Sequence, residues 1–172
     1  GGLMAVIEAI ATTYLEADTA SVTFSSLGSY EHLQLRFSAR SDRSNTYDQA
    51  YVRFNGDTGA NYSNHYMSGY ATTTAAGGAT GRTYNFAYRL SGSQEVAAEY
   101  GTTVLDILDY RNTNKNTTIV GTGGILGTYD EVIFYSGLWD STAAVTSILL
   151  HPYNGSNFVR GSEFTLYGLT DS

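Results

Sequence analysis

The chain of 172 residues contains no cysteine, one proline and one lysine. Without cysteine it can form neither a disulfide nor a thiolate metal site. Its formal net charge of −7 argues against nucleic acid as a partner, because binding phosphate requires cations that replace its condensed counterions. No apolar run approaches the roughly 20 residues that span a bilayer, so no membrane partner is expected.

Glycine and tyrosine are abundant instead, with 19 and 15 copies respectively. Turn residues combined with aromatic and β-branched side chains favour strands over helices. A chain of this length falls within the range of one domain and can bury a substantial core. The composition therefore predicts a single all-β domain over residues 1–172.

Alternation of apolar and polar residues is clearest at 32–40, where Leu33, Leu35, Phe37 and Ala39 alternate with polar neighbours. Successive side chains of a strand point to opposite faces, so this pattern predicts a strand with one buried face. Further strands are predicted at 4–11, 21–24, 51–54, 62–70, 83–88, 103–110, 117–120, 129–135, 145–150 and 164–169. About nine to eleven short strands with turns between them are typical of an antiparallel β-sandwich of jelly-roll type.

Four stretches need separate interpretation. Residues 1–12 are predicted to form an N-terminal arm or an edge strand. Residues 71–81 are small and uncharged, and we expect a loop that is a candidate binding element. Residues 94–100 predict a short helix or an edge strand, and Asn154-Gly155 is the strongest signal for a two-residue turn.

Paired carboxyl groups are the first candidates for catalysis, because glycoside hydrolases place two of them across a cleft. Asp106 and Asp109 fall on opposite faces of one predicted strand, and Asp130 and Glu131 are adjacent and diverge in the same way. We expect all four to be solvated strand positions. The sequence therefore predicts no catalytic residue and no enzyme.

Histidine and the acidic turn at 55–61 are the candidates for metal binding. His32, His65 and His151 show no spacing typical of a zinc site and are expected to be ordinary surface residues. The turn at 55–61 offers oxygen donors, but only Asp57 is charged and no closing glutamate follows. The interpretation as a plain turn is favoured, so neither a metal nor a cofactor is expected.

The many tyrosines suit either a protein interface or stacking on sugars, because each combines a large contact area with a polar tip. We favour a protein interface over simple half-buried strand positions for several of them. With the apolar N-terminal residues, the candidate interface comprises Leu3, Met4, Val6, Ile7, Ile10, Tyr62, Tyr66 and Tyr70. Trp139 fits a core position or a sugar platform, and the core is favoured.

Six segments of the chain together match a known pattern of strands and turns. They are 30–36 (YEHLQLR), 51–62 (YVRFNGDTGANY), 106–110 (DILDY) with Asn112, Asn114 and Lys115, 136–139 (SGLW), 144–148 (AVTSI) and 164–169 (FTLYGL). In these segments the chain resembles a family of bacteriophage virion structural proteins. The resemblance covers most of the chain from residue 21 onward, and it rests on strand and turn signatures rather than catalytic motifs.

The resemblance implies a non-enzymatic jelly-roll protein on the outer surface of a phage particle. We expect a capsid decoration, or cement, protein that stabilises the shell through protein–protein contacts. Its expected partners are the major capsid protein or other virion proteins. A homo-oligomer, dimer or trimer, is also expected.

The alternative is an adhesion module of a tail or fibre that binds a host surface glycan. It would use the region 71–84 and nearby aromatic side chains. The candidate glycan contacts are Tyr84, Trp139, Tyr153 and Asn154.

Overall fold

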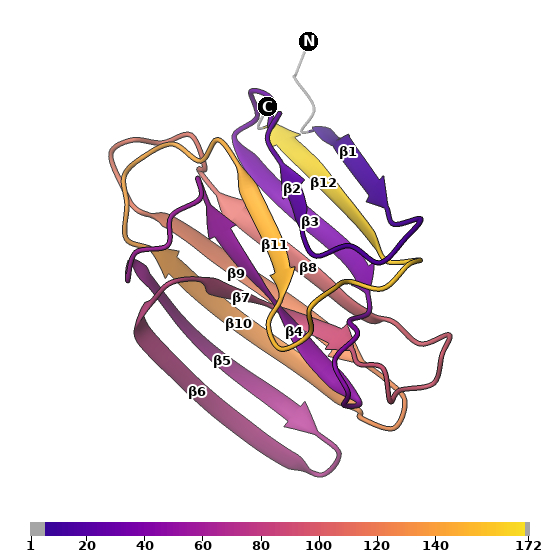
Figure 1. The fold of residues 1–172 in the computed structure, drawn as a ribbon. Helices are drawn as coiled ribbons and strands as arrows, with labels where there is room; N and C mark the ends of the chain where they lie inside the picture. Colours follow the sequence, from indigo (N-terminus) through magenta and orange to yellow (C-terminus); the bar gives the residue numbers. More distant parts are fainter. Residues whose placement is uncertain (1–5, 171–172) are drawn as a thin grey trace.

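The structure is a computed structural model that describes residues 6–170, shown in Figure 1. The strands are β1 (Val6–Tyr14), β2 (Val22–Phe24), β3 (His32–Ala39), β4 (Tyr47–Phe54), β5 (Tyr62–Tyr70), β6 (Thr73–Arg82), β7 (Asn85–Ser91), β8 (Gly101–Leu108), β9 (Thr117–Ile125), β10 (Glu131–Trp139), β11 (Ile148–Pro152) and β12 (Glu163–Thr170). All regular elements in this range are strands, which confirms the all-β prediction. Over residues 6–170, no helix is long and apolar enough to cross a membrane.

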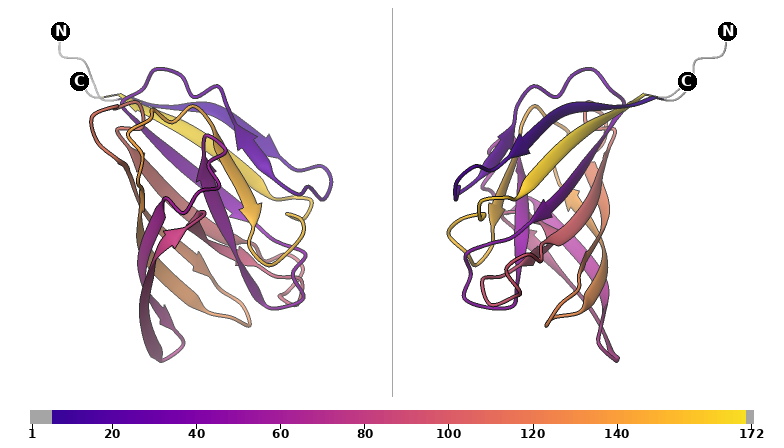
Figure 2. Two further views of the ribbon diagram at one scale, coloured as in Figure 1. Left: turned by 60° about the vertical axis from the view of Figure 1, so that its left-hand side comes forward. Right: turned by 90° about the vertical axis from the view of Figure 1, so that its right-hand side faces the viewer.

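The strands form two antiparallel sheets that lie one over the other as a β-sandwich-like fold (Figure 2). The large sheet has the order β1-β12-β3-β8-β9-β10-β5-β6, and the small sheet has the order β2-β11-β4-β7. The hairpin β5–β6 forms one edge of the large sheet and projects beyond the small sheet (Figure 1). The pair β1 and β12 forms the opposite edge.

Strand pairs are nested along the chain. β2 pairs with β11, β3 with β8, β4 with β7 and β5 with β6. The chain therefore folds back on itself like a long doubled ribbon. The hairpin β9–β10 is inserted into the large sheet between β8 and β5.

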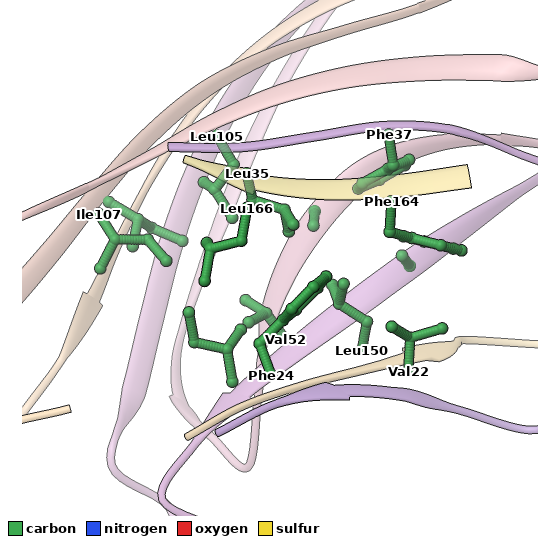
Figure 3. Packing of buried hydrophobic residues seen from close by; sticks show 14 of the residues in the cluster. Val22, Phe24, Leu35, Phe37, Val52, Leu105, Ile107, Leu150, Phe164 and Leu166 are labelled. Carbon is green, nitrogen blue, oxygen red and sulfur yellow. The ribbon is translucent and has the colours of Figure 1, made fainter. Parts of the chain in front are cut away.

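The core lies between the sheets and follows from the alternation in the strands. β3 buries Leu33, Leu35, Phe37 and Ala39 and leaves the residues between them half-buried or exposed, as predicted. Figure 3 shows Leu35, Leu105 and Leu166 of the large sheet facing Phe24, Val52 and Leu150 of the small sheet. Burying one such side chain contributes about 1.5–3 kcal/mol, so this layer holds the two sheets together.

The prediction of a loop at 71–81 is wrong, because β6 occupies most of this range and pairs with β5. The turn is confined to Ala71 and Thr72, and Ala71 has a φ of 48°. A positive φ at the first central position is typical of the type II′ turns that join hairpin strands. No residue of β6 is fully buried, so no hydrophobic alternation marks it; pairing with β5 makes it a strand.

The segment 94–100 is a series of turns rather than the predicted helix or edge strand. Arg40, which directly follows β3 and is buried, holds this segment in place. Its guanidinium donates hydrogen bonds to the carbonyls of Val96 (2.6 Å), Glu99 (3.1 Å), Ser93 (3.2 Å) and Glu95 (2.7 Å). One side chain thus satisfies carbonyl groups that would otherwise need a strand or helix partner.

Asn154-Gly155 does not form the predicted hairpin turn, because it lies in the connection from β11 in one sheet to β12 in the other. Neither residue has the positive φ that a type I′ turn requires. Instead the buried carboxylate of Asp48 accepts hydrogen bonds from both backbone N–H groups, at 3.2 and 2.9 Å. A distant side chain has overridden the local turn signal.

Candidate functional site

An exposed apolar patch lies on the outer face of the large sheet, which turns away from the core. We call Met67, Val120, Val132 and Phe134 the apolar patch. Met67 of β5 and Phe134 of β10 lie directly opposite each other, and 62% and 59% of their surfaces are exposed. Val132 lies on the same face of β10, and Val120 continues the patch on the neighbouring β9. Apolar side chains exposed together across three adjacent strands make this face a candidate interaction surface.

Small residues leave a hollow in this surface. Gly69 lies opposite Val132, and Ala76 of β6 lies opposite Met67. A hollow of about 350 Å³ opens between these residues and Phe134. It offers a partner's apolar side chain a place to enter the patch.

The other half of the same face, on β3, β8 and β12, is polar. Arg36 donates from Nε to Oε1 of Gln34 at 2.7 Å, and Gln34 donates from Nε2 to Oδ1 of Asp106 at 2.7 Å. The Arg36 guanidinium also lies 4.9 Å from the ring centre of Tyr167. These groups satisfy one another, so this half needs no partner to complete its hydrogen bonds.

A second candidate surface lies on the outer face of the small sheet and its flanking loops. We call Tyr51, Tyr84, Phe86, His151 and Tyr153 the aromatic cluster. The rings of Tyr51 and His151 are stacked with centres 5.2 Å apart, and those of Tyr84 and Tyr153 are 5.5 Å apart. Burial, helped by a hydrogen bond with Tyr153, raises the pKa of Tyr84 to about 12, so its hydroxyl is neutral and can donate.

The structure brings together only part of the candidate glycan set. Tyr84 and Tyr153 are neighbours, and the half-exposed side chain of Tyr153 is followed directly by Asn154. The Asn154 side chain is already engaged, since its Nδ2 donates to Oδ1 of Asp48 at 2.8 Å. Trp139 is buried and does not join them.

Trp139 and Tyr62 both belong to the core. The Trp139 ring lies 5.6 Å from that of Phe54, and its Nε1 donates to Oδ2 of Asp57 at 2.7 Å. This confirms the core interpretation and contradicts a glycan contact. Tyr62 is fully buried, burial raises its pKa to about 12, and its hydroxyl accepts the Phe54 N–H at 3.1 Å. The interface assignment of Tyr62 is therefore wrong, because its position at the start of β5 lies under the turn at 55–61.

That turn is confirmed as a turn. Asn55 and Gly56 have φ values of 53° and 67°, as a type I′ turn requires. Three donors bind the Asp57 carboxylate: Trp139 Nε1, Asn61 Nδ2 and the Gly59 N–H. The hydrogen bond from Trp139, followed by those from Asn61 and Gly59, holds the pKa of Asp57 below its usual range. The carboxylate is thus occupied by N–H donors rather than arranged around a cation.

The remaining candidate interface residues divide between exposed and half-buried positions. Val6 and Ile7 are exposed on β1, which is an edge strand paired with β12. Ile10 packs partly against the core. Tyr66 also packs partly against the core, and Tyr70 is exposed and stacks on Tyr129. Leu3 and Met4 lie outside the described residues.

Glu131 is buried rather than solvated, and it forms an ion pair with the buried Arg89. The Arg89 guanidinium also lies 5.0 Å from the ring centres of Tyr47 and Tyr88. Because Glu131 directly precedes Val132 and points inward, the ion pair lies beneath the apolar patch. Residues 131, 133 and 135 alternate with outward-facing neighbours, and this pattern could have predicted that Glu131 is buried. The adjacent acidic residue Asp130 made Glu131 resemble part of a solvated pair instead.

Glu95 is another buried carboxylate that sequence reasoning missed. It accepts the backbone N–H groups of Thr128 at 2.9 Å, Tyr129 at 3.1 Å and Val96 at 3.1 Å. Burial alone would raise its pKa, but these donors outweigh burial and hold the pKa of Glu95 at about 2. The ionised carboxylate ties the segment 94–100 to the connection between β9 and β10.

One group among the described residues has metal-ligand atoms close together: Glu31, His32 and Asp109. His32 Nδ1 already accepts the backbone N–H of Asp109 at 3.0 Å, and the Asp109 carboxylate is paired with Lys115. The hydrogen bond from Lys115 lowers the pKa of Asp109. A cation bound here would have to displace the Lys115 ammonium, so this cluster is complete as an ion pair.

The chain matches no protein-family model, no curated protein and no solved structure.

Proposed function

We propose that this chain is a non-enzymatic structural protein of a phage particle, a capsid decoration protein that stabilises the shell through protein–protein contacts. The apolar patch is the observation that carries the proposal. It exposes large apolar side chains on a face whose other half is mostly polar. Such a surface suits a permanent protein partner, which here would be the major capsid protein or another virion protein.

The proposed sandwich type is a jelly roll. The nested pairs β2–β11, β3–β8, β4–β7 and β5–β6 support this, because a doubled ribbon wrapped into two sheets gives two Greek keys. The hairpin β9–β10 is then an insertion, and β1 and β12 are additions. Jelly rolls serve as viral capsid domains and as lectins, so the topology supports the virion location that the sequence resemblance implies.

Decoration would work by bridging joints between capsid subunits. Phe134 and Met67 would enter apolar surface of the shell, and each buried side chain would add about 1.5–3 kcal/mol of contact energy. Many copies sum such contacts over the particle. The acidic remainder of the surface, with a net charge of −7 for the chain, would face the medium and keep the particle soluble.

Particles that lack this protein provide the test. The purified chain is added, bound copies per particle are counted, and DNA release on heating is measured. We expect hundreds of copies and a higher release temperature. Phe134→Glu should weaken binding about thirtyfold, as loss of a hot-spot residue does.

Thr102→Glu is the matched control, because Thr102 is exposed on the polar half of the same face and lies opposite the uncharged Ser38 and Gly124. It should bind like the unchanged chain. Binding of only a few copies at the tail, or equal loss of binding in both variants, would contradict the proposal.

The aromatic cluster supports a second candidate, an adhesion module that binds a host glycan. Tyr51, Tyr84 and Tyr153 present rings and hydroxyl groups on one surface, and aromatic rings with polar tips suit sugar stacking. A glycan array tests this candidate. Tyr84→Ala and Tyr153→Ala should abolish binding, and Tyr14→Ala, at an exposed tyrosine on β1, should not. No binding by the unchanged chain would exclude the candidate.

A further inference from the structure

Four strands form the outer edges of the two sheets in the described part of the chain: β1, β6, β2 and β7. Edge strands expose unpaired backbone groups, and proteins usually protect them by shortness, charge, bulges or covering elements. β2 has only three residues. β1 carries Glu8 and a bulge between Ala9 and Ala11. The pairing of β7 with β4 shifts register between Asp48 and Ala50, and β7 also packs against β8 and β9.

β6 has none of these protections along most of its length. It is ten residues long, and within residues 6–170 its only neighbour in the sheet is β5. The irregularity in its pairing lies near Arg82, at its far end. Residues 58–81 contain no Asp, Glu, Lys or Arg. A long, regular and uncharged edge of this kind accepts another strand.

The turn at 71–72 shows which backbone groups of β6 are free. A two-residue turn is closed by a hydrogen-bonded pair, here Tyr70 and Thr73. Hydrogen-bonded and non-hydrogen-bonded pairs alternate from there along an antiparallel ladder. Thr74, Ala76 and Gly78 therefore direct their N–H and C=O groups away from β5, toward the open edge.

We propose that β6 pairs antiparallel with β6 of a second copy of this chain, around a two-fold axis at Gly77. The free backbone groups call for a strand as the occupant, and the sequence of β6 is complementary to itself in this register. Small residues meet throughout: Ala76 lies opposite Gly78 of the partner subunit, Ala75 opposite Ala79 of the partner subunit, and Thr74 opposite Thr80 of the partner subunit.

Charge restricts where a second copy can bind. Two copies of a chain with a net charge of −7 repel each other over most of their surfaces. The uncharged residues 58–81 offer a contact in which no like charges lie opposite each other. The closed two-fold pairing also leaves neither β6 edge open to further copies.

This dimer deepens the proposed function, on which it rests for the meaning of the apolar patch. A two-fold axis perpendicular to the sheet keeps both outer faces on the same side. The two apolar patches would then lie on one side of a continuous sheet and bind the shell as a bivalent unit.

Sedimentation equilibrium of the full chain tests the pairing. We expect the mass of a dimer. Ala76→Pro removes one outward N–H without removing a hydrogen bond to β5, so it should give a monomer with an unchanged circular dichroism spectrum and melting temperature. Ala76→Val keeps that N–H and should remain a dimer.

Cross-linking tests the register, because the chain has no cysteine of its own. Opposed residues of a non-hydrogen-bonded pair lie about 4.5 Å apart, within reach of a disulfide. A mixture of Ala75→Cys and Ala79→Cys chains should form a disulfide-linked dimer, and neither variant alone should do so efficiently.

Three results would overturn the pairing: a monomer at every concentration, a dimer that survives Ala76→Pro, or cross-linking by one variant alone. Dissociation by Phe134→Glu with retention in Ala76→Pro would assign self-association to the apolar patch and also overturn it. A monomer that still decorates particles would overturn the dimer and leave the proposed function intact.

Discussion

The two halves of the large sheet's outer face belong to the same sheet but differ in whether their side chains find partners within the chain. On β3, β8 and β12, Gln34, Arg36 and Asp106 form hydrogen bonds with one another. On β5 and β10, Met67 and Phe134 leave more than half of their surface exposed. The first half satisfies its polar groups within the chain, and the second leaves large apolar side chains exposed. This difference is the reason why the proposed function rests on the apolar patch.

The largest effect is expected beneath the apolar half, where Arg89 and Glu131 form a buried ion pair. Glu131→Gln leaves the Arg89 charge buried without its partner, and the free energy of unfolding should fall by about 3–5 kcal/mol. Denaturant unfolding measures this loss. The double variant Arg89→Met, Glu131→Leu removes both charges and should recover most of it. A single variant that costs less than about 1 kcal/mol would show that the apolar half does not depend on this ion pair.

A smaller, pH-dependent effect is expected at Glu95, which anchors the end of the apolar half. Its pKa is lowered from 4.5 to about 2, so its stabilising contribution is complete above pH 4.5 and is lost as the pH falls toward 2. The difference in melting temperature between the unchanged chain and Glu95→Gln should therefore shrink over that range. Glu163→Gln, at an exposed position on β12, is the control and should have little effect at any of these pH values. A difference that stays constant would contradict this prediction.

The smallest effects test the comparison most directly. Gln34→Ala interrupts hydrogen bonds of the polar half and should lower the free energy of unfolding by about 0.5–1.5 kcal/mol. Phe134→Thr keeps a good strand former and should change stability by no more than about 0.5 kcal/mol, because the patch does not hold the fold together. Denaturant unfolding of both variants measures the two effects. The reverse order would show that the patch is part of the core.

The fold was predictable where burial imposes alternation. β3 follows its predicted pattern because Leu33 and Leu35 face the small sheet and their neighbours do not. β6 was missed because its strand conformation depends on β5, and its own small residues carry no pattern. The Asn154-Gly155 signal failed for a similar reason, since the distant Asp48 determines that connection. Local sequence marks strands that bury side chains and misses conformations set by distant partners.

The candidate surfaces were predictable only in part. The sequence indicated Tyr66 and Tyr70 for an interface, yet the two most exposed side chains of the apolar patch are Met67 and Phe134. Phe134 alternates with buried neighbours on β10. Alternation alone does not say which sheet face is outermost when both faces are apolar. Tyr62 and Trp139 are residue types that are common at contact surfaces, but both are buried, beneath the turn at 55–61 and in the core.

The Arg40 guanidinium donates to four carbonyl groups, and these hydrogen bonds also bear on local unfolding of the segment 94–100. The segment 94–100 cannot be released one residue at a time, because a single planar fork holds its carbonyls and that fork is attached to the end of β3. Its excursions from the native state are therefore tied to loosening of the large sheet. In hydrogen exchange, the hydrogen-bonded amides of Gln94, Glu95 and Glu99 should therefore exchange on the slow timescale of the central strands, although the stretch is irregular.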